Sequence, residues 1–244
     1  MDIINKIKKN FDDFTFHARV VPVLVILLPV IAFGVCKGIV SENILEISLY
    51  FSISIIFLVF TARIAREHGK QYEEKMYSEL NGMPTTIILR YSDNRIDTIT
   101  KRRYHEKLNQ LVKGIALPVE KKDETISSDE QYKSAINWLR NYANSNRKTE
   151  PRVYQELKDY NFWRNLYGSR FIAIVLYLLI AIREFFLIDT FDIKTMILQP
   201  YPRYISFLIM LLSIVVFFCS VTKKTVKRKA FDYAKTLVEV CERL

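Results

Sequence analysis

Four long apolar runs constrain this chain more than any other feature. They cover 20–35, 44–62, 171–188 and 204–221, with the polar residues 63–170 between the two pairs. A hydrocarbon core of about 30 Å needs ~20 apolar helical residues, because each backbone N–H and C=O must be paired within the segment. The sequence therefore predicts a mainly α fold: four transmembrane helices and a helical cytoplasmic domain with little β structure, in an oligomer.

The first run is the shortest, and Pro22 and Pro29 interrupt it. A cleaved signal peptide explains it poorly, since it begins deep in the chain and has no small-residue cleavage site before a soluble segment. Proline breaks a helix in water, but in a membrane neighbouring helices can satisfy the carbonyls that proline frees. We expect a kinked first transmembrane helix.

Lysine and arginine are distributed unevenly. The middle segment holds twenty-one, the N-terminal tail four and the C-terminal tail seven, whereas the two short loops hold one and two. Because cytoplasmic loops carry the excess, the middle segment and both termini are predicted to be cytoplasmic, and this rule partly explains the net charge of +10. The predicted organisation is a cytoplasmic segment (1–19), transmembrane helices 1 and 2 (20–62), a cytoplasmic sensor domain (63–170), transmembrane helices 3 and 4 (171–222) and a cytoplasmic C-terminal helix (223–244).

Local patterns in the middle segment predict its elements. Helix formers continue past the second apolar run to Leu80, where Asn81-Gly82-Met83-Pro84 ends the helix. Residues 85–91 are β-branched and short, which is typical of a strand, although no partner strand is evident. Further helices are predicted over 97–113, from Ser127 to about Tyr142, and from Pro151 towards the third apolar run.

The sequence contains none of the common enzyme signatures. It has no Gly-rich phosphate loop, no zinc-protease helix and no nucleophile elbow. His17, His68 and His105 do not share metal-ligand spacing, and the three cysteines show no metal or disulfide pattern. We expect no enzymatic activity, no metal and no cofactor.

Basic and aromatic residues gather near residue 100. Together they resemble a surface that holds phosphate oxygens and stacks on a base, so we predict a nucleotide or single-stranded nucleic acid site. A solvated helix face, or salt bridges to acids such as Glu106, explains the same pattern. The candidate ligand-binding residues are Arg90, Lys101, Arg102, Arg103, Tyr104 and His105.

Two further groups lie in or beside the apolar runs. Trp163, Arg164 and Asn165 precede the third run, where they would anchor the chain at the membrane interface or couple the cytoplasmic domain to the third helix. Glu46, Arg183 and Glu184 are costly to expose to lipid, so they predict a bundle interior or pore vestibule, unless they lie among the outer headgroups.

Three short strings carry a family resemblance: GMPTT over 82–86, TKRRYH over 100–105 and FWRNLYG over 162–168. They resemble a small bacterial four-span membrane effector family of anti-phage defence, of the Hailong type. That resemblance implies a multi-pass protein of the bacterial inner membrane, forming a homo-oligomeric ion channel with a tetramer favoured. It also implies a partner nucleotidyltransferase whose nucleotide or single-stranded DNA product opens or closes the channel.

The leading functional prediction is thus a ligand-gated membrane effector. One alternative is a membrane scaffold that recruits a cytosolic partner enzyme and conducts no ions. The other is a membrane enzyme without a known signature.

Overall fold

The computed structural model describes residues 12–41, 44–125, 127–186 and 202–244. These residues form helices joined by turns, and none of them lies in a strand, which confirms a mainly α fold. Two compact units emerge. Unit 1 comprises Met1–Tyr72 and Asn161–Thr225, and unit 2 comprises Glu73–Tyr160 and Val226–Leu244.

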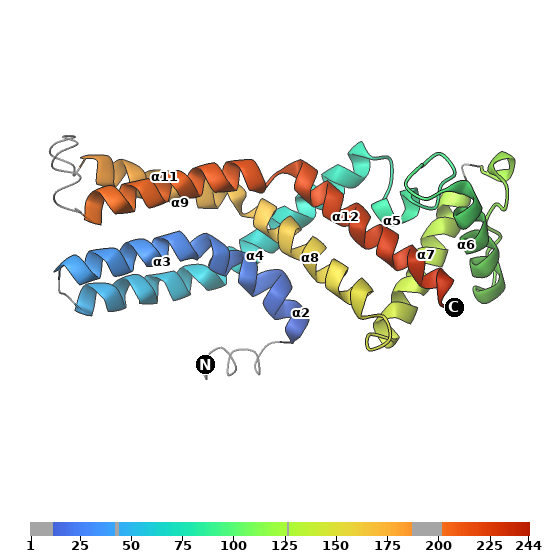
Figure 1. The fold of residues 1–244 in the computed structure, drawn as a ribbon, viewed down its shortest axis with the longest axis horizontal. Helices are drawn as coiled ribbons and strands as arrows, with labels where there is room; N and C mark the ends of the chain where they lie inside the picture. The colour runs from blue at the N-terminus through green and yellow to red at the C-terminus, as the bar shows by residue number, and fades with distance from the viewer. Residues whose placement is uncertain (1–11, 42–43, 126, 187–201) are drawn as a thin grey trace. The chain divides into compact units, whose positions relative to one another are not determined.

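Unit 1 is built mostly from apolar helices. In Figure 1, α9 and α11 run side by side, and α3 lies beside the first part of α4. The helices of this unit are α2 (Asp13–Thr15), the π-helix η1 (Phe16–Val20), α3 (Val21–Ser41), α4 (Ile44–Glu79), the end of α8 (Pro151–Gly168), α9 (Arg170–Phe186) and α11 (Pro202–Ser220).

The surface of unit 1 is unusually apolar. Its core packs residues from α3, α9 and α11, with Tyr177 and Met210 fully buried. On the opposite helix faces, large side chains such as Leu28, Phe171 and Leu212 are more than half exposed. Scattered apolar side chains are normal on a protein surface, but a continuous set on several helices marks contact with lipid or protein.

Membrane spans follow from length and composition. One helix, Asp13–Val35, is long and apolar enough to cross a bilayer. Two helix pairs, α8 with α9 and α11 with α12 (Lys223–Val238), are each bent by 50°, and they raise the number among the described residues to three if each pair is one span. The predicted count of four and the predicted orientation therefore stay predictions.

Both prolines of the first apolar run sit where another helix supplies a hydrogen bond. Pro22 has no N–H for the carbonyl of Ala18, and Asn165 Nδ2 donates to that oxygen at 2.6 Å. On the turn before Pro29, the Tyr177 hydroxyl donates to Ile26 O at 2.6 Å. A neighbouring helix thus satisfies the carbonyl that Pro22 frees, as predicted, whereas the bond near Pro29 is to Ile26 O and not to the Val25 carbonyl that Pro29 frees. The backbone irregularity is the π-helical turn η1.

Unit 2 is a polar helical domain. Asp97 caps α6 by accepting from Thr100 N at 2.8 Å, and Pro151 opens α8, both as predicted. The C-terminal helix α12 belongs to this unit, held by ion pairs such as Lys229 with Asp159. The elements that lie wholly or mostly in unit 2 are α5 (Pro84–Ile87), α6 (Thr98–Leu111), η2 (Lys121–Asp123), α7 (Ser128–Ser145), α12 (Lys223–Val238) and η3 (Glu239–Glu242).

The strand predicted over 85–91 is wrong. Residues Pro84–Ile87 form the short helix α5, in which Ile87 N and Ile88 N donate to the carbonyls of Met83 and Pro84. Consecutive side chains here are buried on all sides, whereas a half-exposed strand buries every second one. The β-branched composition reflected burial in a helical domain.

Candidate functional site

Arg90, the first of the predicted ligand-binding residues, is used inside unit 2. Its Nε and Nη2 form a bidentate pair with Asp129, at 2.8 and 2.6 Å. Nη2 also donates at 2.6 Å to the carbonyl of Asn81, which adopts a positive φ at the end of α4. Arg90 thereby fixes the turn after α4 to the first turn of α7.

Lys101 is also directed inward. Its side chain is 1% exposed, and Nζ donates to Arg90 O at 2.5 Å and to Asp93 O at 2.6 Å. Burial lowers the pKa of Lys101, although nearby carboxylates oppose the change. This ammonium group closes the 90–93 turn and does not face a ligand in this conformation.

Tyr104 and His105 are both buried inside unit 2. His105 is fully buried between two carbonyls, with Nδ1 at 2.6 Å from Pro118 O and Nε2 at 3.0 Å from Leu89 O. Burial lowers the pKa of His105, while the two carbonyl contacts act in the opposite direction. Both residues therefore contribute to packing of the domain.

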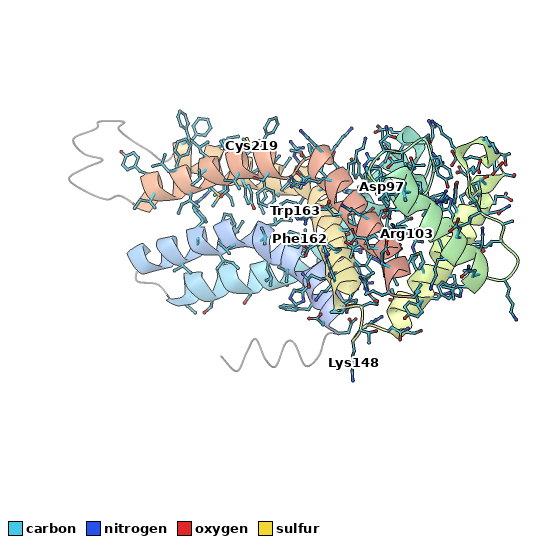
Figure 2. All side chains as sticks on the ribbon, turned by 45° about the vertical axis from the view of Figure 1, so that its right-hand side comes forward. Asp97, Arg103, Lys148, Phe162, Trp163 and Cys219 are labelled. Atoms are coloured by element: carbon cyan, nitrogen blue, oxygen red, sulfur yellow. The ribbon has the colours of Figure 1, made fainter. Side chains whose placement is uncertain are left out.

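Arg102 and Arg103 are the two cationic members that stay exposed. Arg102 lies 3.7 Å from Glu106 on the next turn of α6, and Arg103, visible on α6 in Figure 2, donates to Glu242 at 2.7 Å. That hydrogen bond lowers the pKa of the Glu242 carboxyl. Side-chain direction thus divides the six candidates: Lys101, Tyr104 and His105 are buried, whereas Arg102 and Arg103 are exposed. Ligand binding stays a prediction, and in this conformation Arg102 and Arg103 are the members best placed for it.

The predicted coupling residues lie at a tight helix crossing within unit 1. Gly168 of α8 sits directly on α4: a Cβ built on it would lie 2.4 Å from both Ala65 O and Gly69 N. Ala65 and Gly69 are four residues apart and buried, so they form the small-residue face that such an approach requires. The crossing brings together chain segments about a hundred residues apart, and the sequence alone gives no sign of the pairing.

Arg164 and Asn165 are buried at this crossing. Asn165 Oδ1 accepts from the Arg164 guanidinium at 3.3 Å, and Nδ2 donates to Ala18 O. The buried Ser169 hydroxyl donates to the carbonyls of Asn165 and Leu166, at the 50° bend between α8 and α9. Asn165 therefore connects α8 to the first apolar helix at the point where α8 turns into α9.

Trp163 and the predicted intramembrane charges Arg183 and Glu184 contact residues next to them in the chain. Trp163 packs edge-to-face on Phe162, with ring centroids 5.5 Å apart, and both are labelled in Figure 2. Glu184 is fully buried and accepts from Arg183 Nη1 at 2.6 Å, whereas Arg183 is half exposed. Glu46 lies in α4, but its side chain is outside the described residues.

A pocket of about 460 Å³ in unit 1 was not predicted. It lies where α9 begins and α11 ends, and Arg170 holds its guanidinium 5.0 Å from the centre of the Phe218 ring. His68 Nδ1 lies 3.3 Å from Gly168 O on the same wall. The sequence feature that could have indicated this pocket is Arg170, a basic residue directly before the third apolar run. The lining residues are His68, Tyr167, Gly168, Arg170, Phe171, Ile174 and Phe218.

Within the described ranges, no group of three or more histidine, cysteine or acidic residues could hold a metal ion. Comparison with known proteins gives no assignment either: no family model, no curated protein and no solved structure matches the chain.

Proposed function

We propose that this protein is an oligomeric membrane channel effector, in which the polar unit 2 receives an intracellular signal and unit 1 acts in the bilayer. The observation that carries the proposal is the distribution of exposed apolar side chains. Those with large exposed areas lie almost entirely on the helices of unit 1, and the described part of unit 2 contributes only Ile99 and Leu111. This distribution of exposed apolar side chains is the one expected if unit 1 lies in lipid and unit 2 in water.

A pore would have to form between subunits. Among the described residues, side chains such as Ile26, Tyr177 and Met210 fill the centre of the apolar unit, which supports a pore between copies of the chain. Helix α4 exposes Ser48 and Ser52 one turn apart, and the Ser52 hydroxyl donates to Ser48 O at 2.8 Å. Hydroxyls on an otherwise apolar exposed face suit a water-filled path shared by several copies around a common axis.

Helix α4 also supports signal transfer. It is one helix of 36 residues that contributes to both units, so a change in unit 2 can act on its apolar part without crossing a flexible loop. The Gly69–Gly168 crossing and the Asn165 hydrogen bond would pass the same change to α9 and α3. The signal class, a nucleotide or single-stranded DNA, comes from the resemblance and is proposed on that basis.

The experiment is cysteine modification of the full-length protein in liposomes that report ion flux, in a background in which the three native cysteines are replaced by serine. A charged, water-soluble thiol reagent should change the flux of Ser52→Cys and leave Ser213→Cys unchanged. The two serines are matched, because each hydroxyl donates to the carbonyl four residues earlier, at 2.8 and 2.7 Å, and only Ser52 is exposed.

Three results separate the possibilities. Flux that responds at residue 52 alone supports the α4-lined pore. Equal responses at both positions would remove α4 from the pore lining. Absence of flux with nucleotides and single-stranded oligonucleotides present would contradict the channel and favour the scaffold that recruits an enzyme.

A further inference from the structure

The pocket beside Arg170 combines two chemistries. Its lining includes the apolar side chains Phe171, Ile174 and Phe218, and Phe171 is 77% exposed. Arg170 and His68 line the same pocket, and the Arg170 guanidinium lies over the Phe218 ring. A cavity of about 460 Å³ lies within the usual range of ligand pockets.

Arg170 is available for an anion. In the described part of the chain it forms no ion pair, and its guanidinium lies over the face of the Phe218 ring. A guanidinium that stacks on an aromatic ring keeps its edge N–H donors for a bidentate phosphate contact. The structure therefore holds a strong phosphate donor next to an open apolar wall.

Further positive charge lies close to the pocket. Tyr167, which lines it, packs on Tyr72 with ring centroids 4.4 Å apart, and the Tyr72 hydroxyl donates to the backbone carbonyl of Lys223 at 3.4 Å. Lys223 and Lys224 are both exposed in the first turn of α12, immediately after the apolar helix α11. Basic residues directly after a membrane helix attract anionic lipid headgroups.

We infer that this pocket binds an anionic phospholipid, with the phosphate held by Arg170 and an acyl chain lying along Phe171, Ile174 and Phe218. The combination of charge and apolar wall selects this occupant: a free anion would leave the apolar wall exposed, and a neutral lipid would leave the guanidinium unpaired. The inference rests on the proposed embedding of unit 1 in the bilayer, and it does not require a pore.

The test uses full-length protein in a nonionic detergent, titrated separately with phosphatidylglycerol, phosphatidylcholine and inorganic phosphate while thermal unfolding is recorded. A ligand that binds the folded state raises the midpoint with its concentration. Phosphatidylglycerol should raise it most. Arg170→Gln should weaken the apparent affinity for phosphatidylglycerol about five-fold, the typical contribution of one basic residue at a lipid surface.

Two variants complete the design. Ile174→Trp fills the apolar side and should also reduce the phosphatidylglycerol effect, which keeps the test decisive if Arg170→Gln misfolds. Arg102→Gln removes an exposed arginine of unit 2 that does not line the pocket, and should leave the titration unchanged.

Several outcomes would overturn the inference. Equal stabilisation by phosphatidylcholine removes the charge selectivity, and equal stabilisation by inorganic phosphate means a free-anion site. Equal losses in Arg102→Gln and Arg170→Gln would indicate a general effect of net charge. Failure of membrane embedding is detected separately, because the protein would then be released from membranes at alkaline pH, and absence of ion flux would leave the lipid titration unaffected.

Discussion

Substitution of Gly168 by alanine is the sharpest perturbation of the helix crossing. The new Cβ would lie 2.4 Å from Ala65 O and Gly69 N, and 2.9 Å from Gly69 Cα. All three atoms belong to the backbone of α4, so no side-chain rotation can relieve the overlap. The two helices would have to separate by roughly 1 Å to reach ordinary van der Waals contact.

The size of the effect follows from two opposing contributions. Overpacking of a tight contact costs about 1–3 kcal/mol, whereas alanine gains up to ~1 kcal/mol over glycine in a helix. We expect a net loss of about 2 kcal/mol in the free energy of unfolding. For a chain of this length that corresponds to a midpoint lowered by roughly 4–8 °C.

The assay is thermal unfolding in detergent, followed by circular dichroism, with two glycines as matched controls. A Cβ on Gly69 would lie 3.0 Å from Arg164 O, so Gly69→Ala needs a shift of only a few tenths of an ångström and should be close to neutral. Gly114 has open space around it and a φ of +83°, so Gly114→Ala should cost about 1 kcal/mol through backbone strain alone.

The reasoning predicts an order: Gly168→Ala the most destabilised, Gly114→Ala next, and Gly69→Ala near the original protein. A midpoint for Gly168→Ala equal to that of the original protein would refute the close approach of α8 to α4. If Gly69→Ala fell by more than Gly168→Ala, the crossing would exist with a different register. Ion flux measured on the same variants would then report whether the crossing takes part in gating.

Three other predictions concern single side chains. Asn165→Leu leaves Ala18 O without its donor and should lower the free energy of unfolding by about 1–3 kcal/mol in denaturant titrations; no loss would contradict that hydrogen bond. Burial lowers the pKa of His105, so the folded state binds fewer protons than the unfolded state below about pH 6.5, and stability should fall as the pH falls from there. His105→Gln should remove that slope, and an unchanged slope would assign it elsewhere. Arg102→Ala should reduce the salt dependence of single-stranded oligonucleotide binding by about 0.7 in log–log slope, while Lys122→Ala, exposed at η2, should not; equal slopes in both variants would remove Arg102 from the ligand site.

The helix boundaries could be predicted because their signals are local. Asp97 before α6, Pro151 at the start of α8 and the Asn81-Gly82 turn after α4 act on neighbouring backbone groups, and each lies where the sequence placed it. The strand over 85–91 was wrong for a non-local reason. β-branched residues favour any buried position, and only the surrounding helices decide that this one is a helical turn.

The basic and aromatic residues 101–105 also could not be interpreted from local sequence alone. The sequence correctly placed Lys101, Arg102, Arg103, Tyr104 and His105 on one helix, but a helix of this kind presents them in several directions. Which of them points inward depends on acceptors that come from other segments, such as Arg90 O for Lys101 and Pro118 O for His105. Spacing therefore predicted that these residues share one helix, but it could not separate the exposed residues from the buried ones.

Proline offers a route from sequence to such long-range contacts. A proline within a helix leaves a carbonyl of the preceding turn in need of a donor, and in lipid no water can supply it. Pro22 thus requires a polar side chain near Ala18, and the amide of Asn165 meets that need from a segment 147 residues away. The polar residues that precede the third apolar run are thereby better explained as a structural connection to the first helix than as an interface anchor alone.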